Sequence, residues 1–217
     1  MCKTSSITLK VVLPLFLLNL LTACSSSIPL KAQFDEPPLF KKIDAKVGVV
    51  CGFGTHEFHF FKTIDGAGLY KVKFDEVSVK RFEQVFASIF SEVVFLPSWP
   101  PWQEVLPNFD GIILLDNAEL SALLGDDMGR NAEYVLVRYR ICLYKPDGGK
   151  VNCWETLAEQ HHQRQAFERN LDIPAYLANL VDTASREAIA KFMMKFEEDP
   201  HVDAWVEKFA IGNVSSQ

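Results

Sequence analysis

The chain has 217 residues, of which 48% are hydrophobic, and its 22 Lys and Arg against 28 Asp and Glu give a formal net charge of −6. This length suits one domain with a substantial apolar core, and 17 Phe and 4 Trp residues supply much of the volume. The acidic balance argues against nucleic acid as a partner. The sequence contains no internal repeat and no low-complexity tract.

The amino-terminal residues have the layout of a secretory signal. Residues 1–10 carry two lysines and no acid, and residues 11–21 form an apolar run. A membrane-spanning helix needs about 20 apolar residues, whereas this run has 11 residues and contains Pro14 and Asn19. Residues 1–23 are therefore predicted to be a signal peptide.

The end of this signal, Leu21-Thr22-Ala23-Cys24, resembles the lipobox of bacterial lipoproteins, in which small residues precede a cysteine that receives diacylglycerol. The resemblance implies cleavage before Cys24, which removes two lysines and leaves 194 residues with a net charge of −8. An ordinary signal peptide followed by an incidental cysteine is the alternative. Several acyl chains on one cysteine would anchor the protein stably, and no cofactor other than this covalent lipid is expected.

The residue after the lipidated cysteine bears on localisation. In lipoproteins of Gram-negative bacteria, an Asp at this position usually signals retention in the inner membrane, and here the residue is Ser25. The resemblance therefore implies a lipid-anchored protein on the periplasmic face of the outer membrane, with the inner membrane as the weaker alternative.

The residues that follow divide into a linker, one domain and a tail. Residues 24–42 contain serines and prolines without periodicity and are predicted to be a lipidated tether, with an extended reach of about 55 to 60 Å. Residues 43–212 are predicted to form a single periplasmic α/β domain. Residues 213–217 are expected to fray.

The first half of this domain reads as strands followed by a helix and a further strand. The first three strands of a sheet are expected at residues 46–53, 56–62 and 69–74, and a later strand at 111–115. Between the third of these strands and the strand at 111–115, apolar residues recur at spacings of three and four from Val77 to Val93. This spacing predicts an amphipathic helix with Asp75 as its cap.

A β-hairpin is predicted between residues 134 and 156. If its turn centres on Asp147-Gly148, then Cys142 faces Cys153, Arg140 faces Glu155 and Ile141 faces Trp154. In this register opposite charges face each other, and apolar side chains face apolar side chains. A type I turn with a bulged glycine would shift the pairing by one residue and place the cysteines on opposite faces. We prefer the first register.

Two helices are predicted at the carboxyl end. A long helix begins near Asp172 and Pro174, and its apolar face should cover the sheet; that face consists of Leu177, Leu180, Val181, Ala184, Ala188, Phe192 and Phe196. A short helix begins at Asp199-Pro200, ends at Gly212, and buries one face. The residues expected on that face are Val202, Trp205, Val206 and Phe209.

The predicted fold is therefore α/β (α+β): one domain with a mostly antiparallel sheet, a crossing helix, and a long carboxyl-terminal helix packed on it. In layout, this order is similar to the small α/β lipoproteins of Gram-negative outer membranes. A looser likeness extends to the amino-terminal domain of the translocation protein TolB. Neither likeness includes a diagnostic motif, so no function follows from them.

The cysteines suggest one disulfide. In an oxidising compartment the mature chain keeps Cys51, Cys142 and Cys153 besides Cys24, and a Cys142–Cys153 bridge would close the hairpin. The alternative is that all three are small core hydrophobes. A catalytic Cys51 would need a positioned histidine, and His56 is near only in sequence.

No metal site is predicted. His161 and His162 follow Glu159, but adjacent histidines do not present two ligands on one helical face as HExxH sites do, and a solvated polar surface is the preferred interpretation. The mature chain also lacks GxSxG and SxxK, which excludes the simplest serine hydrolases.

Trp99 and Trp102 lie in a proline-rich loop, Pro97-Ser-Trp-Pro-Pro-Trp-Gln103, and are the most suggestive surface feature. If exposed, these rigid aromatic rings predict a protein or membrane contact. The alternative is that both rings fold back over the core.

The preferred function is a non-catalytic envelope lipoprotein that supports or tethers an assembly through a protein partner. One alternative is a cell-wall or small-molecule hydrolase, with a site assembled from scattered residues such as Glu155, Glu159 and His162. The other is a carrier of an apolar ligand, which requires an internal cavity between sheet and helices.

Overall fold

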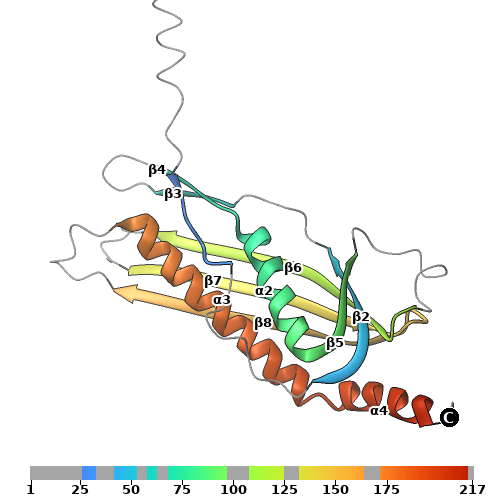
Figure 1. Cartoon of the computed structure of the whole chain (residues 1–217). Helices are drawn as coiled ribbons and strands as arrows, with labels where there is room; N and C mark the ends of the chain where they lie inside the picture. The colour runs from blue at the N-terminus through green and yellow to red at the C-terminus, as the bar shows by residue number, and fades with distance from the viewer. Residues whose placement is uncertain are drawn as a thin grey trace, which may run out of the picture.

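The computed structural model of the chain describes residues 26–32, 42–52, 58–62, 68–96, 108–124, 132–163 and 172–214. Its elements in chain order are β1 (Ser26–Ser27), β2 (Ile43–Cys51), β3 (Phe58–Lys62), β4 (Gly68–Val72), α2 (Phe74–Ile89), β5 (Phe90–Leu96), β6 (Gly111–Leu124), β7 (Ala132–Tyr144), β8 (Lys150–Gln163), α3 (Ile173–Glu197) and α4 (Pro200–Val214) (Figure 1). Within these ranges, no helix combines the length and the apolar character that crossing a bilayer requires.

The main sheet has five strands in the order β5-β2-β6-β7-β8. Strand β2 is parallel to both of its neighbours, and the long strands β6, β7 and β8 form an antiparallel meander. Helix α2 connects β4 to β5, and α3 lies along the same face of the sheet (Figure 1). The predicted fold class is therefore confirmed: a mixed α/β domain with a mostly antiparallel sheet covered by a crossing helix and a long carboxyl-terminal helix.

The strands expected to open this sheet are divided between two sheets. Strand β2 lies between β5 and β6 in the main sheet, whereas β4 pairs with β3 and with β1 in a small second sheet of order β1-β4-β3. The prediction of one sheet is wrong here because alternation of apolar residues indicates that a segment is extended but does not specify its neighbours.

Helix α2 begins and ends earlier than its apolar period suggests. It stops at Ile89, and Phe90–Leu96 forms β5, which pairs in parallel with β2. The run of aromatic and β-branched residues favours a strand once a partner strand is available. Asp75 is also not the cap: the helix starts after Lys73, and Asp75 is buried in the first turn with 2% exposure.

The hairpin of β7 and β8 has the preferred register from Ala132 to Leu143. Cys142 faces Cys153, Arg140 faces Glu155 and Ile141 faces Trp154, which confirms the pairing expected from cross-strand complementarity. Next to the turn, Tyr144 faces Lys150, one residue out of that register, and a bulge restores it. The expected turn centred on Asp147-Gly148 is wrong: the hydrogen bonds that join Lys145 to Gly148 and Gly149, and the positive φ of Gly148 alone, are those of the type I turn with a bulged glycine.

The turn that closes this hairpin has a glycine at the position that requires one. Gly148 has a φ of 85°, a left-handed conformation that glycine adopts without strain. The backbone N–H of Gly149 donates a 2.8 Å hydrogen bond to the Asp147 carboxylate.

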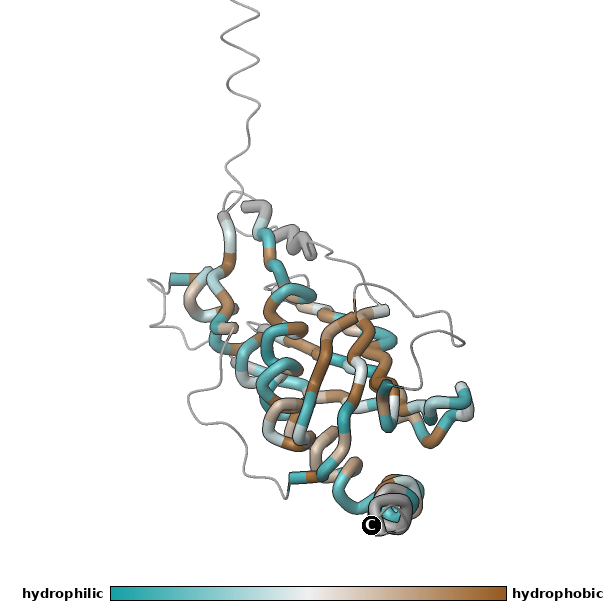
Figure 2. Tube along the Cα trace, turned by 45° about the vertical axis from the view of Figure 1, so that its right-hand side comes forward, coloured by the Kyte–Doolittle hydropathy of each residue, from teal (hydrophilic) through white to brown (hydrophobic). Residues whose placement is uncertain are grey.

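Aromatic rings fill the space between the sheet and the helices. Phe82 packs edge-on against Tyr139 at 5.1 Å between ring centroids, and Trp154 packs against Phe196 at 5.2 Å. All four side chains are at most 5% exposed, and burying each contributes on the order of 2 to 3 kcal/mol. Figure 2 shows the hydrophobic residues concentrated in the central strands.

The segment predicted to be a free tether is partly docked. Strand β1 pairs with β4, and Ile28, with 4% exposure, belongs to the hydrophobic core, with Leu30 packed against it. The tether prediction is therefore wrong for residues 26–32, because two alternating apolar side chains find a place in the core. Residues 33–41 and residues 1–25, which include the predicted signal peptide 1–23, lie outside the described part of the chain.

The carboxyl-terminal helices follow the sequence pattern closely. The carboxylate of Asp172 accepts a hydrogen bond from the Ala175 backbone N–H, which caps α3 as predicted, and the predicted apolar face is buried. Helix α4 begins at Pro200 as expected but continues through Gly212 to Val214. The expected end at Gly212 is wrong, since a single glycine in a helix costs only about 1 kcal/mol relative to alanine.

Candidate binding groove at the corner of α3 and α4

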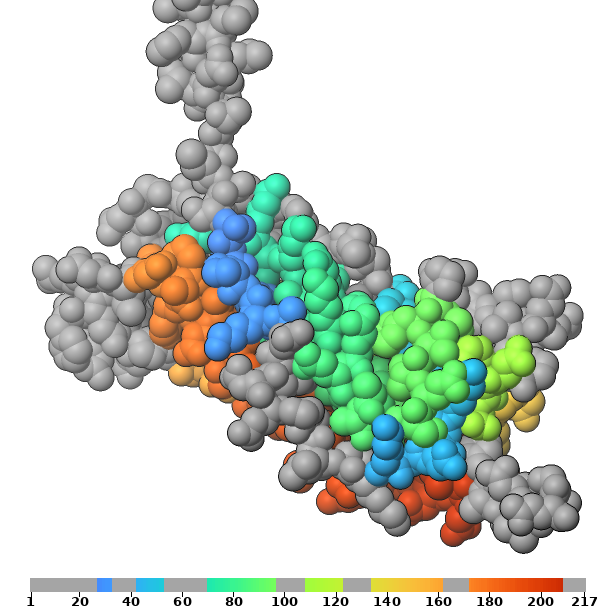
Figure 3. All heavy atoms as spheres, in the orientation of Figure 1, coloured from blue at the N-terminus to red at the C-terminus, as the bar shows by residue number. Residues whose placement is uncertain are grey.

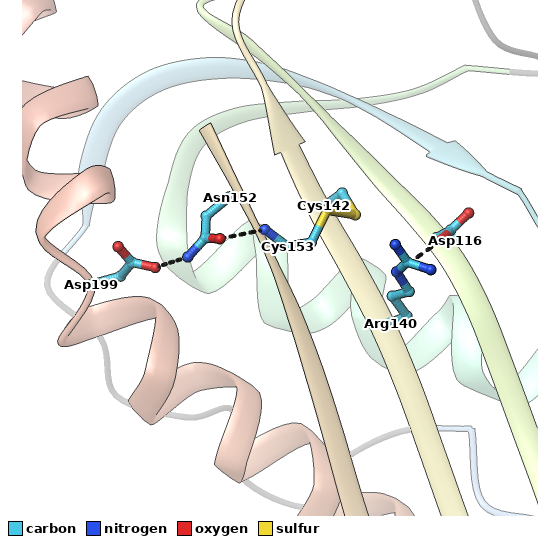
Figure 4. Close-up of a disulfide and its surroundings, with 6 residues drawn as sticks. All are labelled: Asp116, Arg140, Cys142, Asn152, Cys153 and Asp199. Carbon is cyan, nitrogen blue, oxygen red and sulfur yellow. Dashed lines mark hydrogen bonds and ion pairs between the residues drawn. A yellow bond between two sulfur atoms is a disulfide. The ribbon is translucent and has the colours of Figure 1, made fainter. Parts of the chain in front are cut away.

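Asp199 organises the corner where α3 ends and α4 begins. Its carboxylate accepts hydrogen bonds from the backbone N–H of His201 at 2.8 Å, from Nε1 of Trp154 at 2.9 Å, and from Nδ2 of Asn152 (Figure 4). Burial alone would raise the pKa of Asp199, but the hydrogen bonds from Asn152, His201 and Trp154 lower it below the ordinary value. The ionised side chain therefore both caps α4 and ties it to β8.

The hairpin disulfide is connected to this corner through Asn152. Cys142 and Cys153 are joined across β7 and β8. The side-chain oxygen of Asn152 accepts a 2.8 Å hydrogen bond from the Cys153 backbone N–H, while its amide nitrogen donates to Asp199 (Figure 4). Asn152 thus links the cross-linked part of the sheet to the start of α4.

Trp205 fixes the other side of α4. It is 2% exposed, its Nε1 donates a 3.2 Å hydrogen bond to the Asp110 carbonyl, and its ring packs edge-on against Phe90. A Cβ added to Gly111 would lie 2.8 Å from the Trp205 ring, so this close approach requires glycine. Helix α4 is therefore held at two points, by Asp199 and by Trp205.

A groove of about 370 Å³ lies between the start of β2 and this helical corner. Its apolar lining consists of Ile43, Phe196, Val202 and Val206, and its charged rim consists of Lys42, Asp44, Glu197, Asp203 and Glu207. In Figure 3 the start of β2 lies next to α4 at the lower end of the molecule. All five charged residues are exposed, and the carboxylates outnumber the single lysine.

The rim carboxylates are available to a ligand. No ion pair among the described residues involves Asp44, Glu197, Asp203 or Glu207. An apolar floor below uncompensated acids suits an apolar side chain with cationic neighbours. The apolar side chains and carboxylates of this groove are therefore suited to binding such a segment.

The residues singled out in the sequence are placed elsewhere or are not described. Cys24, Trp99 and Trp102 lie outside the described residues, as does His56. Cys51 is free and half-buried near the end of β2; burial, and then the charge of Glu83, raises the pKa of its thiol. A raised pKa disfavours the thiolate that a catalytic cysteine needs.

The described residues of the hydrolase alternative do not line this groove. Glu155 and Glu159 are exposed on β8, and Glu155 lies 3.5 Å from the Arg138 guanidinium. Neither carboxylate lines the groove. The side chain of His162 is not among those that the structure describes. Among the described residues, no three His, Cys, Asp or Glu side chains are arranged to hold a metal ion.

The groove itself was missed by the sequence analysis. Its rim comes from the residue before β2, from β2, and from two helices more than 150 positions later, so no local pattern contains it. The one available signal was in the last helices, where acids follow apolar residues directly at Phe196-Glu197, Val202-Asp203 and Val206-Glu207.

No protein-family model matches this chain, and no curated protein sequence matches it. Among solved structures, a proposed neuraminyllactose-binding hemagglutinin homologue from Helicobacter pylori is 7% identical, with a TM-score of 0.53 over 84% of this chain and 99% of that chain. A Xanthomonas campestris protein of family DUF330 is 8% identical over 81% and 95%, with a TM-score of 0.43. A minor lipoprotein from Acinetobacter baumannii is 10% identical over 71% and 95%, with a TM-score of 0.35. The first similarity is one of fold alone, and the two with TM-scores below 0.5 carry no argument.

Proposed function

We propose that this protein is a non-catalytic lipoprotein, anchored through Cys24 to the periplasmic face of the outer membrane, that tethers an envelope assembly by binding a protein partner. The acidic-rimmed apolar groove is the observation that carries the proposal, since it offers a concave surface with uncompensated charge. The lipobox residues Leu21 to Cys24 support the anchor.

The groove indicates the chemistry of the partner segment. Ile43 and Val206 are half-buried and present apolar surface beside the almost fully buried Phe196 and Val202, so the floor can receive an apolar side chain. Burying one such side chain contributes about 1.5 to 3 kcal/mol. Lys or Arg on either side of it would face Asp203 and Glu207, where each exposed pair adds at most about 1 kcal/mol but speeds association and selects against acidic segments.

A crosslinking pull-down from outer membranes tests this assignment. The variant Asp203→Lys/Glu207→Lys should lose the partner, and Glu83→Lys/Glu159→Lys is the matched control, since it makes the same charge change on exposed residues of α2 and β8. The control should retain the partner. Equal recovery of one partner with both variants would exclude the groove as its binding site.

The Trp99/Trp102 loop is proposed as a second contact and is tested separately. Trp99→Ala/Trp102→Ala should weaken recovery of the same partner without changing the thermal stability of the domain. A loss of stability instead would assign the two rings to the core.

A further inference from the structure

The chain enters the fold only two residues after Cys24. Ser26 and Ser27 form β1 and pair with Tyr70 and Lys71 of β4, and the next backbone N–H, that of Ile28, donates a 2.9 Å hydrogen bond to the Lys71 carbonyl. The Ile28 side chain is 4% exposed in the core. Strand pairing and apolar burial therefore hold this segment from its first described residue.

A buried arginine holds the same segment a few residues later. Arg81 of α2 has no exposed surface, and its Nε and Nη2 donate hydrogen bonds of 3.2 and 2.6 Å to the Lys31 carbonyl. The same guanidinium is paired with the carboxylate of Asp182 on α3. A planar group with five donors can serve a carbonyl and a carboxylate together, so Arg81 joins the segment to both helices.

The segment lies along the surface between these two helices. Figure 3 shows residues 26–32 in blue, between α2 in green and the first part of α3 in orange. We call Ser26–Lys31 the latch.

The latch limits how far the domain can move from a lipid on Cys24. Two residues span at most about 7 Å, whereas a free tether through residue 42 would reach about 55 to 60 Å. We propose that the latch seats the β1–β4 end of the domain directly against a phospholipid bilayer, and that the domain keeps one orientation there. This inference rests on the lipid anchor of the proposed function.

The orientation determines where the groove points. Arg81 contacts α3 at Asp182, and the groove is lined by Glu197 of the same helix. These positions are separated by 15 residues, or about 22 Å along a helix that rises 1.5 Å per residue. In Figure 1 the small sheet and α4 lie at opposite ends of α3. The groove is therefore held away from the bilayer, where it is open to a periplasmic partner.

Energy transfer to a labelled membrane tests the latch. In a chain that begins at Cys24 and carries Cys51→Ser, Cys24 is coupled to a maleimide lipid in phosphatidylethanolamine/phosphatidylglycerol vesicles that contain a headgroup acceptor dye. A donor dye is placed, through an encoded azide, at Lys73 near β4 or at Lys208 on α4, both of which are exposed. The efficiency of energy transfer should be at least about twofold higher from Lys73 than from Lys208, because the two ends of the domain are separated by about 22 Å along α3.

Two changes show whether the latch causes this difference. A 16-residue Gly-Ser linker inserted after Cys24 adds a reach of about 22 Å without altering the domain, and it should bring the two transfer values together. The same linker after Gln217 is the matched control and should leave them apart. Ile28→Ser should loosen the latch and have the effect of the inserted linker; should this variant not fold, the linker pair still decides the question.

Equal transfer from both lysines in the chain without a linker would overturn the latch. A difference that survives the inserted linker would overturn it as well. Because the lipid is attached chemically, either result leaves the lipidation of Cys24 in cells undecided, and that reaction is measured separately by fatty-acid labelling.

Discussion

Replacing Asp199 with alanine should destabilise the domain, because this carboxylate holds the corner of α3 and α4 beside the groove. The carboxylate accepts three hydrogen bonds, one of them from the nearly buried indole of Trp154 and one from the backbone of His201 at the start of α4. A buried hydrogen bond to a charged acceptor contributes about 1.5 to 3 kcal/mol, and the hydrogen bond that caps the exposed end of α4 contributes less. The free energy of unfolding should therefore fall by about 3 kcal/mol. With an m-value of about 2 kcal/mol per molar urea, the unfolding midpoint should fall by about 1.5 M.

The pH dependence of this loss provides an internal check. Because the pKa of Asp199 is lower in the folded state than in the unfolded chain, its ionisation stabilises the fold above the ordinary aspartate pKa of about 3.9. That part of the stability is lost as the pH falls through the lowered folded pKa. The gap between wild type and Asp199→Ala should therefore be widest above about pH 5 and should narrow toward pH 2.

The matched control is Asp199→Asn, which keeps the shape and one side-chain acceptor but removes the charge. It should cost about half as much as Asp199→Ala. A midpoint shift below about 0.3 M for Asp199→Ala, or a loss of stability of the same size at pH 2 and pH 7, would refute the role given to the ionised carboxylate.

Three further changes test other parts of the fold by urea unfolding. Cys142→Ser/Cys153→Ser should cost about 3 kcal/mol, because the unfolded chain regains the entropy of a short loop; an unchanged midpoint would contradict this. Tyr139→Phe should cost about 1 to 2 kcal/mol, since it leaves two buried serine hydroxyls without their shared partner, and no change would show that they find other partners. Asp182→Ala should cost about 3 kcal/mol or more by leaving the buried guanidinium of Arg81 unpaired, and adding Arg81→Met should restore part of the loss; a double variant no better than the single would argue against an uncompensated charge.

The predictable parts of the fold are those in which local chemistry and tertiary contacts agree. The hairpin register follows from the complementarity of Arg140 with Glu155 and of Ile141 with Trp154, and the sheet has that register. Helix α3 likewise combines a capping Asp172 with one continuous apolar face. In both cases residues close in sequence carry the information.

Elsewhere the deciding contact is distant in sequence. The apolar spacing of α2 continues beyond Ile89, but pairing with β2 converts Phe90–Leu96 into a strand. The docking of Ile28 depends on a place in a core formed by later elements. The groove depends on β2 meeting α4, so the acids that its two helices contribute appear in sequence as an ordinary solvated helix surface.

Labelling of living cells with a fatty-acid probe tests the central claim, a lipid anchor on Cys24, most directly. The wild-type chain should take up the label and fractionate with the outer membrane, and Cys24→Ala should lose the label while the domain still folds. Label that persists in Cys24→Ala, or a wild-type protein that is secreted without label, would contradict the account.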